Sequence, residues 1–162
     1  YALIGELPES KKTWVDGFMK IVSTEFIRAT PAAGLAAVAD FASYPQWNPW
    51  IVRAEGVCKT GADGVVDAWV GGRLGRYRHK IVQFEPSTVL HWCDVGWFTR
   101  FVDGERIRTC VPQAGGTCYR VELNVSGPLA FLAQWLFGGS LALGLSRETQ
   151  ALKAYVEARA GI

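Results

Sequence analysis

Six strand candidates of six to eleven residues follow one another at regular intervals between residues 50 and 126, and this pattern constrains the fold most. Clusters of glycine, proline and aspartate separate the segments and are typical of tight turns. Short connections favour antiparallel neighbours, because a parallel pair needs a long crossover. The sequence therefore predicts an antiparallel meander. The predicted strands cover residues 50–57, 64–70, 77–84, 89–94, 101–111 and 117–126.

One further strand and three helices are predicted around this meander. Residues 18–29 are rich in Ile, Val, Thr and Phe and predict the first strand. Thr30 as N-cap and Pro31 at the first helical position predict a short helix that continues through residues 32–40. A second short helix or turn is expected at residues 44–48, and Gly127-Pro128 opens a long helix to about residue 159. Residues 1–17 are expected to be an N-terminal extension of a single domain over residues 18–162.

Five short motifs occur in order along the chain. The most specific is Asp40-Phe-Ala-Ser-Tyr-Pro-Gln-Trp-Asn-Pro-Trp-Ile51, in which an acidic residue, two proline turns and the start of an apolar strand follow one another. The other four motifs are Glu85-Pro86 followed by Leu90-x-Trp92, Gly115-Gly-Thr117, Ser126-Gly-Pro-Leu129 and Leu152-Lys153. With this set of motifs, the chain resembles the START-like (SRPBCC) superfamily, which includes birch-pollen-allergen-like proteins, polyketide cyclases/dehydratases and lipid-transport domains.

The resemblance implies an α+β helix-grip fold. A curved antiparallel sheet of about seven strands would surround the long C-terminal helix, and two short helices would follow the first strand. It also implies a cavity between the sheet and the helix that holds a hydrophobic small molecule. A lipid, sterol, isoprenoid or polyketide-like compound is the expected partner.

Charge and motif content argue against several other classes of protein. The net charge of +2 and the scattered basic residues do not favour nucleic-acid binding. No dinucleotide, Walker, nucleophile-elbow, HExxH or EF-hand motif is present, so we expect no cofactor. Four cysteines without CxxC spacing and only two histidines predict no metal site. Nothing in the sequence argues for secretion, so a cytoplasmic location is expected.

Two of the cysteines flank a turn. Cys110 and Cys118 lie on either side of residues 111–117, which leaves open a cross-strand disulfide, although such a bond is usually strained. Reduced thiols are the expectation for a cytoplasmic protein.

Residues 128–146 contain no charge, and their length is close to that of a membrane span. Gln134, Gly138 and Gly139 dilute the run, and the helix continues into Arg147-Glu148, which favours a buried core helix. An alternative is that Gly138-Gly139 makes the helix flexible and that its first half makes transient contact with a membrane.

His79 is the best candidate for acid–base chemistry, because an imidazole titrates near neutral pH. Strand alternation places Tyr77, His79 and Ile81 on the inward face, and Tyr119 on the inward face of the last strand. The two tyrosines could then hold an oxyanion near the imidazole. A core histidine that only packs against its neighbours is the alternative.

Other candidate ligand-binding residues are inward-facing apolar residues, aromatic residues near the expected mouth of the cavity, and one arginine. Trp97 and Phe98 lie in the loop after residue 94 and are candidates for a hydrophobic lid or a partner-binding spot, with simple anchoring of the loop as the alternative. Trp47 and Trp50 are expected to be structural, and His91 is expected to point outward. The candidate set is Trp69, Ile81, Leu90, Trp92, Trp97, Phe98, Arg108, Val121, Leu123, Phe131 and Trp135.

The orientation of the strand over residues 101–111 is ambiguous. Hydrophobicity turns Ile107, Thr109 and Val111 inward together with Glu105, and leaves Arg106 and Arg108 in solvent. The superfamily pattern instead turns Arg106, Arg108 and Cys110 inward. A slip of one residue exchanges the two faces. We favour the first orientation, whereas the second would give the cavity a group that selects anionic oxygens.

Two functions are compatible with these features. The first is a binding protein for a hydrophobic small molecule. The second is an enzyme that resembles polyketide cyclases and dehydratases and uses the same cavity to orient a reactive chain and move protons. A quinone-binding or toxin-like role is a weaker third option. Because one fold supports both main functions, the polar groups that converge in the cavity must distinguish them.

Overall fold

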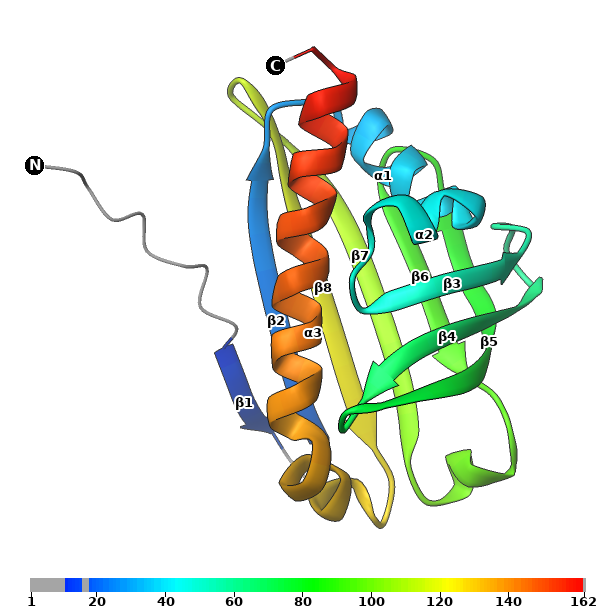
Figure 1. Cartoon of the computed structure of the whole chain (residues 1–162). Coiled ribbons are helices and arrows are strands. Elements are labelled where there is room, and N and C mark those ends of the chain that lie inside the picture. Colours follow the sequence, from blue (N-terminus) through cyan, green and yellow to red (C-terminus); the bar gives the residue numbers. More distant parts are fainter. Residues whose placement is uncertain (1–10, 16–17, 162) are drawn as a thin grey trace, which may run out of the picture.

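The computed structural model describes residues 11–15 and 18–161, which form an antiparallel sheet of eight strands together with three α-helices (Figure 1). The strands are β1 (Lys11–Val15), β2 (Phe18–Ile27), β3 (Ile51–Gly56), β4 (Asp63–Val70), β5 (Arg73–Glu85), β6 (Val89–Asp94), β7 (Asp103–Gln113) and β8 (Gly116–Ser126). The helices are α1 (Pro31–Ala39), α2 (Tyr44–Trp47) and α3 (Ala130–Arg159), with the 3-10 turns η1 (Phe41–Ser43) and η2 (Trp97–Arg100).

The order of the strands in the sheet is β1-β2-β8-β7-β6-β5-β4-β3, and every neighbouring pair is antiparallel. Strands β3 to β8 form the predicted meander, and β2 pairs with β8 to complete it. The predicted α+β helix-grip fold is confirmed, including the short helices after β2. The eighth strand, β1, lies within the predicted N-terminal extension and pairs with β2. The rest of that extension, residues 1–10 and 16–17, lies outside the described residues.

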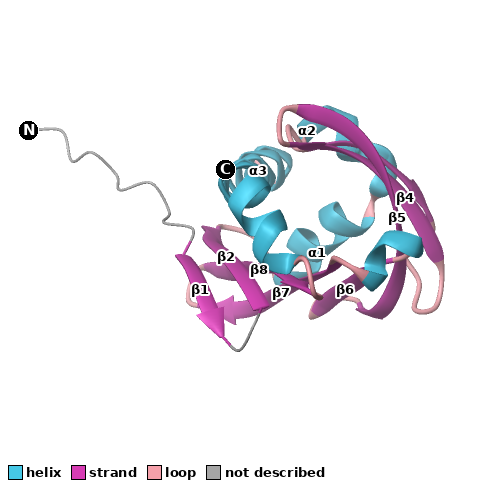
Figure 2. Cartoon of the chain, turned by 90° about the horizontal axis from the view of Figure 1, so that it is seen from below, coloured by secondary structure: helices cyan, strands magenta, loops and turns pink. Residues whose placement is uncertain are grey.

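The sheet is strongly curved, and α3 lies on its concave side (Figure 2). The helix packs on β2 and β8 near one end of the sheet and also contacts β4 near the other end. One helix therefore bridges the opening of the curved sheet. The interior is enclosed between the sheet, α1 and α3.

The most specific sequence motif anchors this arrangement. The side-chain oxygen of Asn48 accepts hydrogen bonds from the backbone N–H groups of Trp50 (3.0 Å) and Ile51 (2.8 Å), as its position before Pro49 predicts. The indole of Trp50 donates to the carbonyl of Trp69 at 2.7 Å. It also lies against Gly144 of α3, where an added Cβ would be 2.6 Å from the ring. The motif thus joins the start of β3 to both β4 and α3.

The two halves of α3 have different surroundings. Leu145, Leu152 and Val156 in the second half are buried, whereas Phe131 and Trp135 in the first half are 60% and 80% exposed. The prediction that the apolar run over residues 128–146 is a buried core helix is therefore correct only toward the C-terminal end of the run, where Ala142, Gly144 and Leu145 are buried. Among the described helices, none is both long and apolar enough to cross a membrane. Transient membrane contact by the first half stays a prediction.

The strand register excludes the disulfide that the sequence left open. Cys110 pairs with Tyr119, and Cys118 pairs with Val111, so the two cysteines are not opposite each other. Cys110 is buried on the inner face, whereas Cys118 alternates with the buried Thr117 and Tyr119 and so points away from the core. All four cysteines are free.

Candidate functional site

A pocket of about 590 Å³ lies between the concave face of the sheet and the first half of α3. Most of its lining residues are apolar, and β4, β8 and α3 supply eight of the eighteen lining residues, with Val66, Leu123 and Phe137 as examples. Four polar side chains also reach the pocket from β5, β6 and β7. They are Arg73, Tyr77, Asp94 and Arg106.

Arg106 places a cation in this mostly apolar pocket. Its guanidinium lies 4.3 Å from the centre of the Trp50 ring and 5.5 Å from that of Trp92, within the range of cation–π attraction. Its Nε has no hydrogen-bond partner among the described residues. Burial, together with repulsion from Arg108, lowers the pKa of Arg106 to about 10, so it remains protonated at neutral pH. The pocket therefore holds a positive charge with an unused donor.

Asp94 brings a carboxyl group to the same pocket. Burial raises the pKa of Asp94 to about 6, although the positive charge of Arg106 opposes this shift. Gly104, on the neighbouring strand, makes room for the carboxylate, because an added Cβ at position 104 would collide with it. Burial and the nearby Asp94 both raise the pKa of Tyr77, so its phenol stays a hydrogen-bond donor at neutral pH.

Arg108 forms a buried ion pair with Glu148 of α3. Its Nε and Nη2 donate to the same carboxylate oxygen at 3.1 and 2.8 Å, and both side chains are 0% exposed. The guanidinium also lies 4.1 Å from the centre of the Trp92 ring. Burial alone would lower the pKa of Arg108, but the Glu148 carboxylate reverses this and holds the pKa above its ordinary value. The pair joins β7 to α3.

His79 is buried beside this pair and outside the pocket lining. Its ring stacks on Trp92, with 4.4 Å between the ring centres, and meets Phe41 edge-on. Neither ring nitrogen has a hydrogen-bond partner in the described part of the chain. Burial, reinforced by Arg108 and Arg106, lowers the pKa of His79 to about 4. His79 is therefore a neutral, enclosed imidazole at pH 7 and a weak base.

The predicted site residues fall into three groups. Four of them line the pocket: Tyr77, Trp92, Phe98 and Leu123. Six others are buried deeper in the core: His79, Ile81, Leu90, Arg108, Tyr119 and Val121. The predicted catalytic trio is thus split, because Tyr77 faces the pocket while His79 and Tyr119 do not.

The third group lies on the surface and does not line the pocket, so the predicted part of these side chains in ligand binding stays a prediction. Val66, Ala68 and Val70 take the inward positions of β4, which turns Trp69 outward to 44% exposure. Trp97 of η2 is 79% exposed while its neighbour Phe98 reaches the pocket. Phe131 and Trp135 lie on the side of α3 that faces away from the lining residues Ala133, Phe137 and Leu141.

The favoured orientation of β7 is wrong. Arg106, Arg108 and Cys110 face inward, as the superfamily pattern implied, and Val111 is 56% exposed. The reason is that contacts with distant residues stabilise the inward charges. Glu148 forms an ion pair with Arg108, and the guanidinium groups of Arg106 and Arg108 pack on the rings of Trp50 and Trp92. Glu105 consequently points away from the pocket.

Most of the lining residues lie outside the predicted site, and three of them, Trp50, Asp94 and Arg106, bear on the chemistry of the pocket. Asp94 is absent from the candidate set and Trp50 is predicted to be only structural, yet both line the pocket. A signal for Asp94 exists, because the alternation that turns Leu90 and Trp92 inward continues to position 94. The contribution of Gly104 depends on contact with a neighbouring strand and has no sequence signal.

Comparison with known proteins agrees with this architecture. A family model described as polyketide cyclase/dehydrase and lipid transport matches residues 19–157. The chain belongs to this family. No match was found among curated proteins.

Several solved structures share the fold. The Zhui aromatase/cyclase from Streptomyces sp. R1128 is similar with a TM-score of 0.74 and 12% identity, over 88% of this chain and 96% of that one. A START superfamily protein from Mycobacterium smegmatis has a TM-score of 0.66 and 20% identity, and the match covers 86% of this chain and 98% of that one. Ara h 8.0201 has a TM-score of 0.65 and 17% identity, and the match covers 86% of this chain and 98% of that one. At these identities the likeness establishes the START-like fold alone.

Removing one partner of the buried ion pair should destabilise the protein more than removing both. Glu148→Leu leaves an unpaired buried guanidinium, and we expect a loss of about 3–5 kcal/mol in the free energy of unfolding. The double variant Arg108→Met/Glu148→Leu should recover most of this loss, because both charges are gone. Urea unfolding of the wild type, both single variants and the double variant measures the coupling. If the double variant lost as much unfolding free energy as the two single variants together, the ion pair would not have the role described.

His79 should make the protein sensitive to acid. The folded-state pKa of about 4 lies below the unfolded value of about 6.5, so the unfolded chain binds the proton more readily between these pH values. The stability that His79 contributes is therefore complete above pH 6.5 and is lost as the pH falls toward 4. We expect wild type to lose about 2–3 kcal/mol more than His79→Phe between pH 7.5 and pH 4.5. Parallel losses in the two proteins, measured by urea unfolding at both pH values, would show that His79 does not cause the effect.

Proposed function

We propose that the protein binds a hydrophobic small molecule, of polyketide or lipid type, whose apolar body fills the pocket and whose anionic or enolic oxygen meets Arg106. The observation that carries this proposal is the protonated Arg106 with an unpaired Nε in a mostly apolar pocket. Arg106 is half-buried and forms no ion pair among the described residues, and an anionic ligand oxygen would supply a partner for its guanidinium.

The rest of the lining supports a ligand with aromatic or extended apolar character. Trp50 and Trp92 present indole rings to the pocket, and the volume of about 590 Å³ lies within the range of about 300–1,000 Å³ that is usual for small-molecule sites. Family membership supports the same class of ligand, because the family description covers both polyketide cyclisation and lipid transport.

Arg106→Met should weaken binding selectively. For an anthraquinone carboxylic acid as probe, we expect the dissociation constant to rise by about 10- to 100-fold, because one charge-assisted hydrogen bond is lost. The same ring system without the carboxylate should bind the variant and the wild type about equally. Isothermal calorimetry with both probes measures the difference.

The matched control for this experiment is Arg78→Met, which removes an exposed arginine from β5 and should change neither affinity. Leu123→Trp should block both probes, because it fills the pocket. If Leu123→Trp leaves both affinities intact, the probes bind elsewhere and the proposal fails. If Arg106→Met weakens both probes equally, the proposal fails in its assignment of the anionic end.

A second candidate function is cyclisation or dehydration of a polyketide-like chain, and the convergence of Asp94, Tyr77 and Arg106 in one pocket favours it. In this proposal Asp94 takes a proton from a methylene group between two carbonyls, and Arg106 stabilises the resulting enolate oxygen. The enolate carbon attacks a second carbonyl of the same chain, and the alkoxide formed receives a proton from Tyr77. The proton on Asp94 then restores Tyr77, directly or through water.

Asp94→Asn should separate this function from simple binding. We expect the cyclisation rate of a β-polyketone thioester surrogate to fall by at least about 100-fold, since the general base is removed. The affinity for the decarboxylated anthraquinone should stay within about threefold of wild type, because most of the apolar contacts remain. Asp67→Asn on the outer face of β4 serves as the control and should cyclise normally. Unchanged turnover in Asp94→Asn would remove Asp94 from the mechanism and leave a binding protein.

A further inference from the structure

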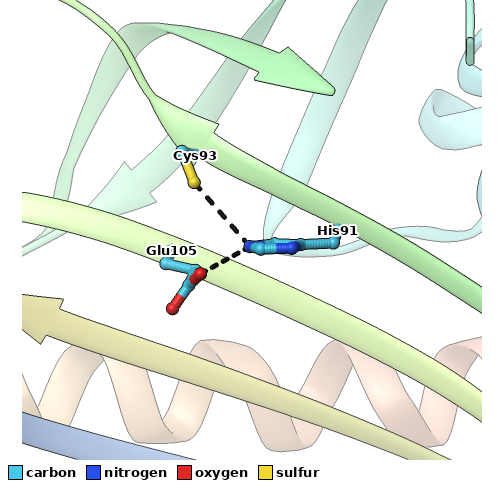
Figure 3. A group of neighbouring side chains, drawn as sticks. All are labelled: His91, Cys93 and Glu105. Atoms are coloured by element: carbon cyan, nitrogen blue, oxygen red, sulfur yellow. Dashed lines mark hydrogen bonds and ion pairs between the residues drawn. The ribbon is translucent and has the colours of Figure 1, made fainter. Parts of the chain in front are cut away.

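Three potential metal ligands converge on the outer face of the sheet, opposite the pocket (Figure 3). His91 and Cys93 lie two residues apart on β6, so both point to the same face, while Trp92 between them points to the pocket. Glu105 of β7 pairs directly with Cys93 in the sheet. One ligand atom from each of the three lies within 4.8 Å of the other two.

The distances between these atoms are close to those of a tetrahedral zinc site. With metal–ligand bonds of about 2.0–2.3 Å, tetrahedral geometry separates N and S by about 3.6 Å and N and O by about 3.3 Å. The Nε2 of His91 lies 3.7 Å from the sulfur of Cys93 and 2.6 Å from a carboxylate oxygen of Glu105. The nitrogen–sulfur separation therefore already fits, whereas the carboxylate oxygen lies closer to Nε2 than a tetrahedral site allows and has to move away from it.

An outer hydrogen bond already orients the carboxylate. Asn124 of β8, which pairs with Glu105, donates from its side-chain nitrogen to Oε2 of Glu105 at 3.2 Å. The other oxygen, Oε1, is the one that faces His91. Partners of this kind fix the geometry of metal ligands, and the site spans three adjacent strands of one sheet.

We propose that His91, Cys93 and Glu105 form a binding site for a divalent cation of the zinc type. A mixed nitrogen, sulfur and oxygen donor set suits Zn²⁺ and excludes Mg²⁺ and Ca²⁺, which take oxygen ligands. The three residues are half-buried rather than enclosed, so solvent supplies the fourth ligand. Binding replaces the hydrogen bond between His91 and Glu105 with bonds to the metal and requires the thiol of Cys93 to lose its proton.

Cobalt(II) is the probe that tests this site, because a thiolate ligand gives Co²⁺ a charge-transfer band in the near ultraviolet. The complete chain, without a histidine tag and treated with chelator under anaerobic reducing conditions, is titrated with Co²⁺ and then with Zn²⁺. We expect one equivalent of Co²⁺ to produce the band and Zn²⁺ to abolish it.

Four variants identify the ligands. Cys93→Ala should abolish the band, and His91→Gln should weaken Co²⁺ binding by at least about 100-fold, since each removes a ligand. Asn124→Ala should weaken it by about tenfold. Cys118→Ala, which removes a half-buried outward-facing thiol from β8, should keep the band with the wild-type affinity. Circular dichroism verifies that each variant is folded.

Three results would overturn the proposal. The first is a wild-type protein that gives no band, whether or not Co²⁺ binds to the His91–Glu105 pair. The second is a band that survives in folded Cys93→Ala, and the third is a band that disappears in Cys118→Ala. Loss of the band in Cys93→Ala and the expected weakening of Co²⁺ binding in His91→Gln, with the band retained in Cys118→Ala, support it.

Discussion

The buried ion pair between Arg108 and Glu148 determines which face of β7 is turned inward. An unpaired charge at either position would cost several kcal/mol, so the two residues must be brought together or both be exposed. Because Glu148 lies in the buried half of α3, the sheet has to present Arg108 to the helix. The pair therefore fixes the orientation of β7 and its position along α3 at the same time.

The chemistry of the pocket follows from this orientation. Arg106, two residues before Arg108, is turned to the same inner face but has no carboxylate partner of its own among the described residues. Trp50 and Trp92 supply aromatic faces for the cation, and Asp94 shares the pocket without an ion pair to it in the described part of the chain. A fold that needs Arg108 for its own packing thus also carries a second cation that a ligand can use.

The fold could be predicted from the sequence because its signals are local. Alternation and turn residues specified the meander, and Thr30 and Asn48 marked a helix start and a turn that the structure contains. The site was harder, since it depends on contacts between distant residues. The inward turn of Arg108 requires Glu148, which is 40 positions away. Trp69 and Trp135 are apolar but exposed, because smaller neighbours occupy the inner positions.

The outer cluster depends on the same constraint. A slip of β7 by one residue would expose Arg108 and would also move Glu105 away from Cys93, because both pairings belong to one register. The ion pair on the inner face thus holds the proposed metal ligands opposite each other on the outer face. Linear spacing could not reveal this site, since two ligands come from one strand and the third from its neighbour. The strands β6 and β7 therefore carry two separate groups of reactive side chains, one on each face, and a single register positions both.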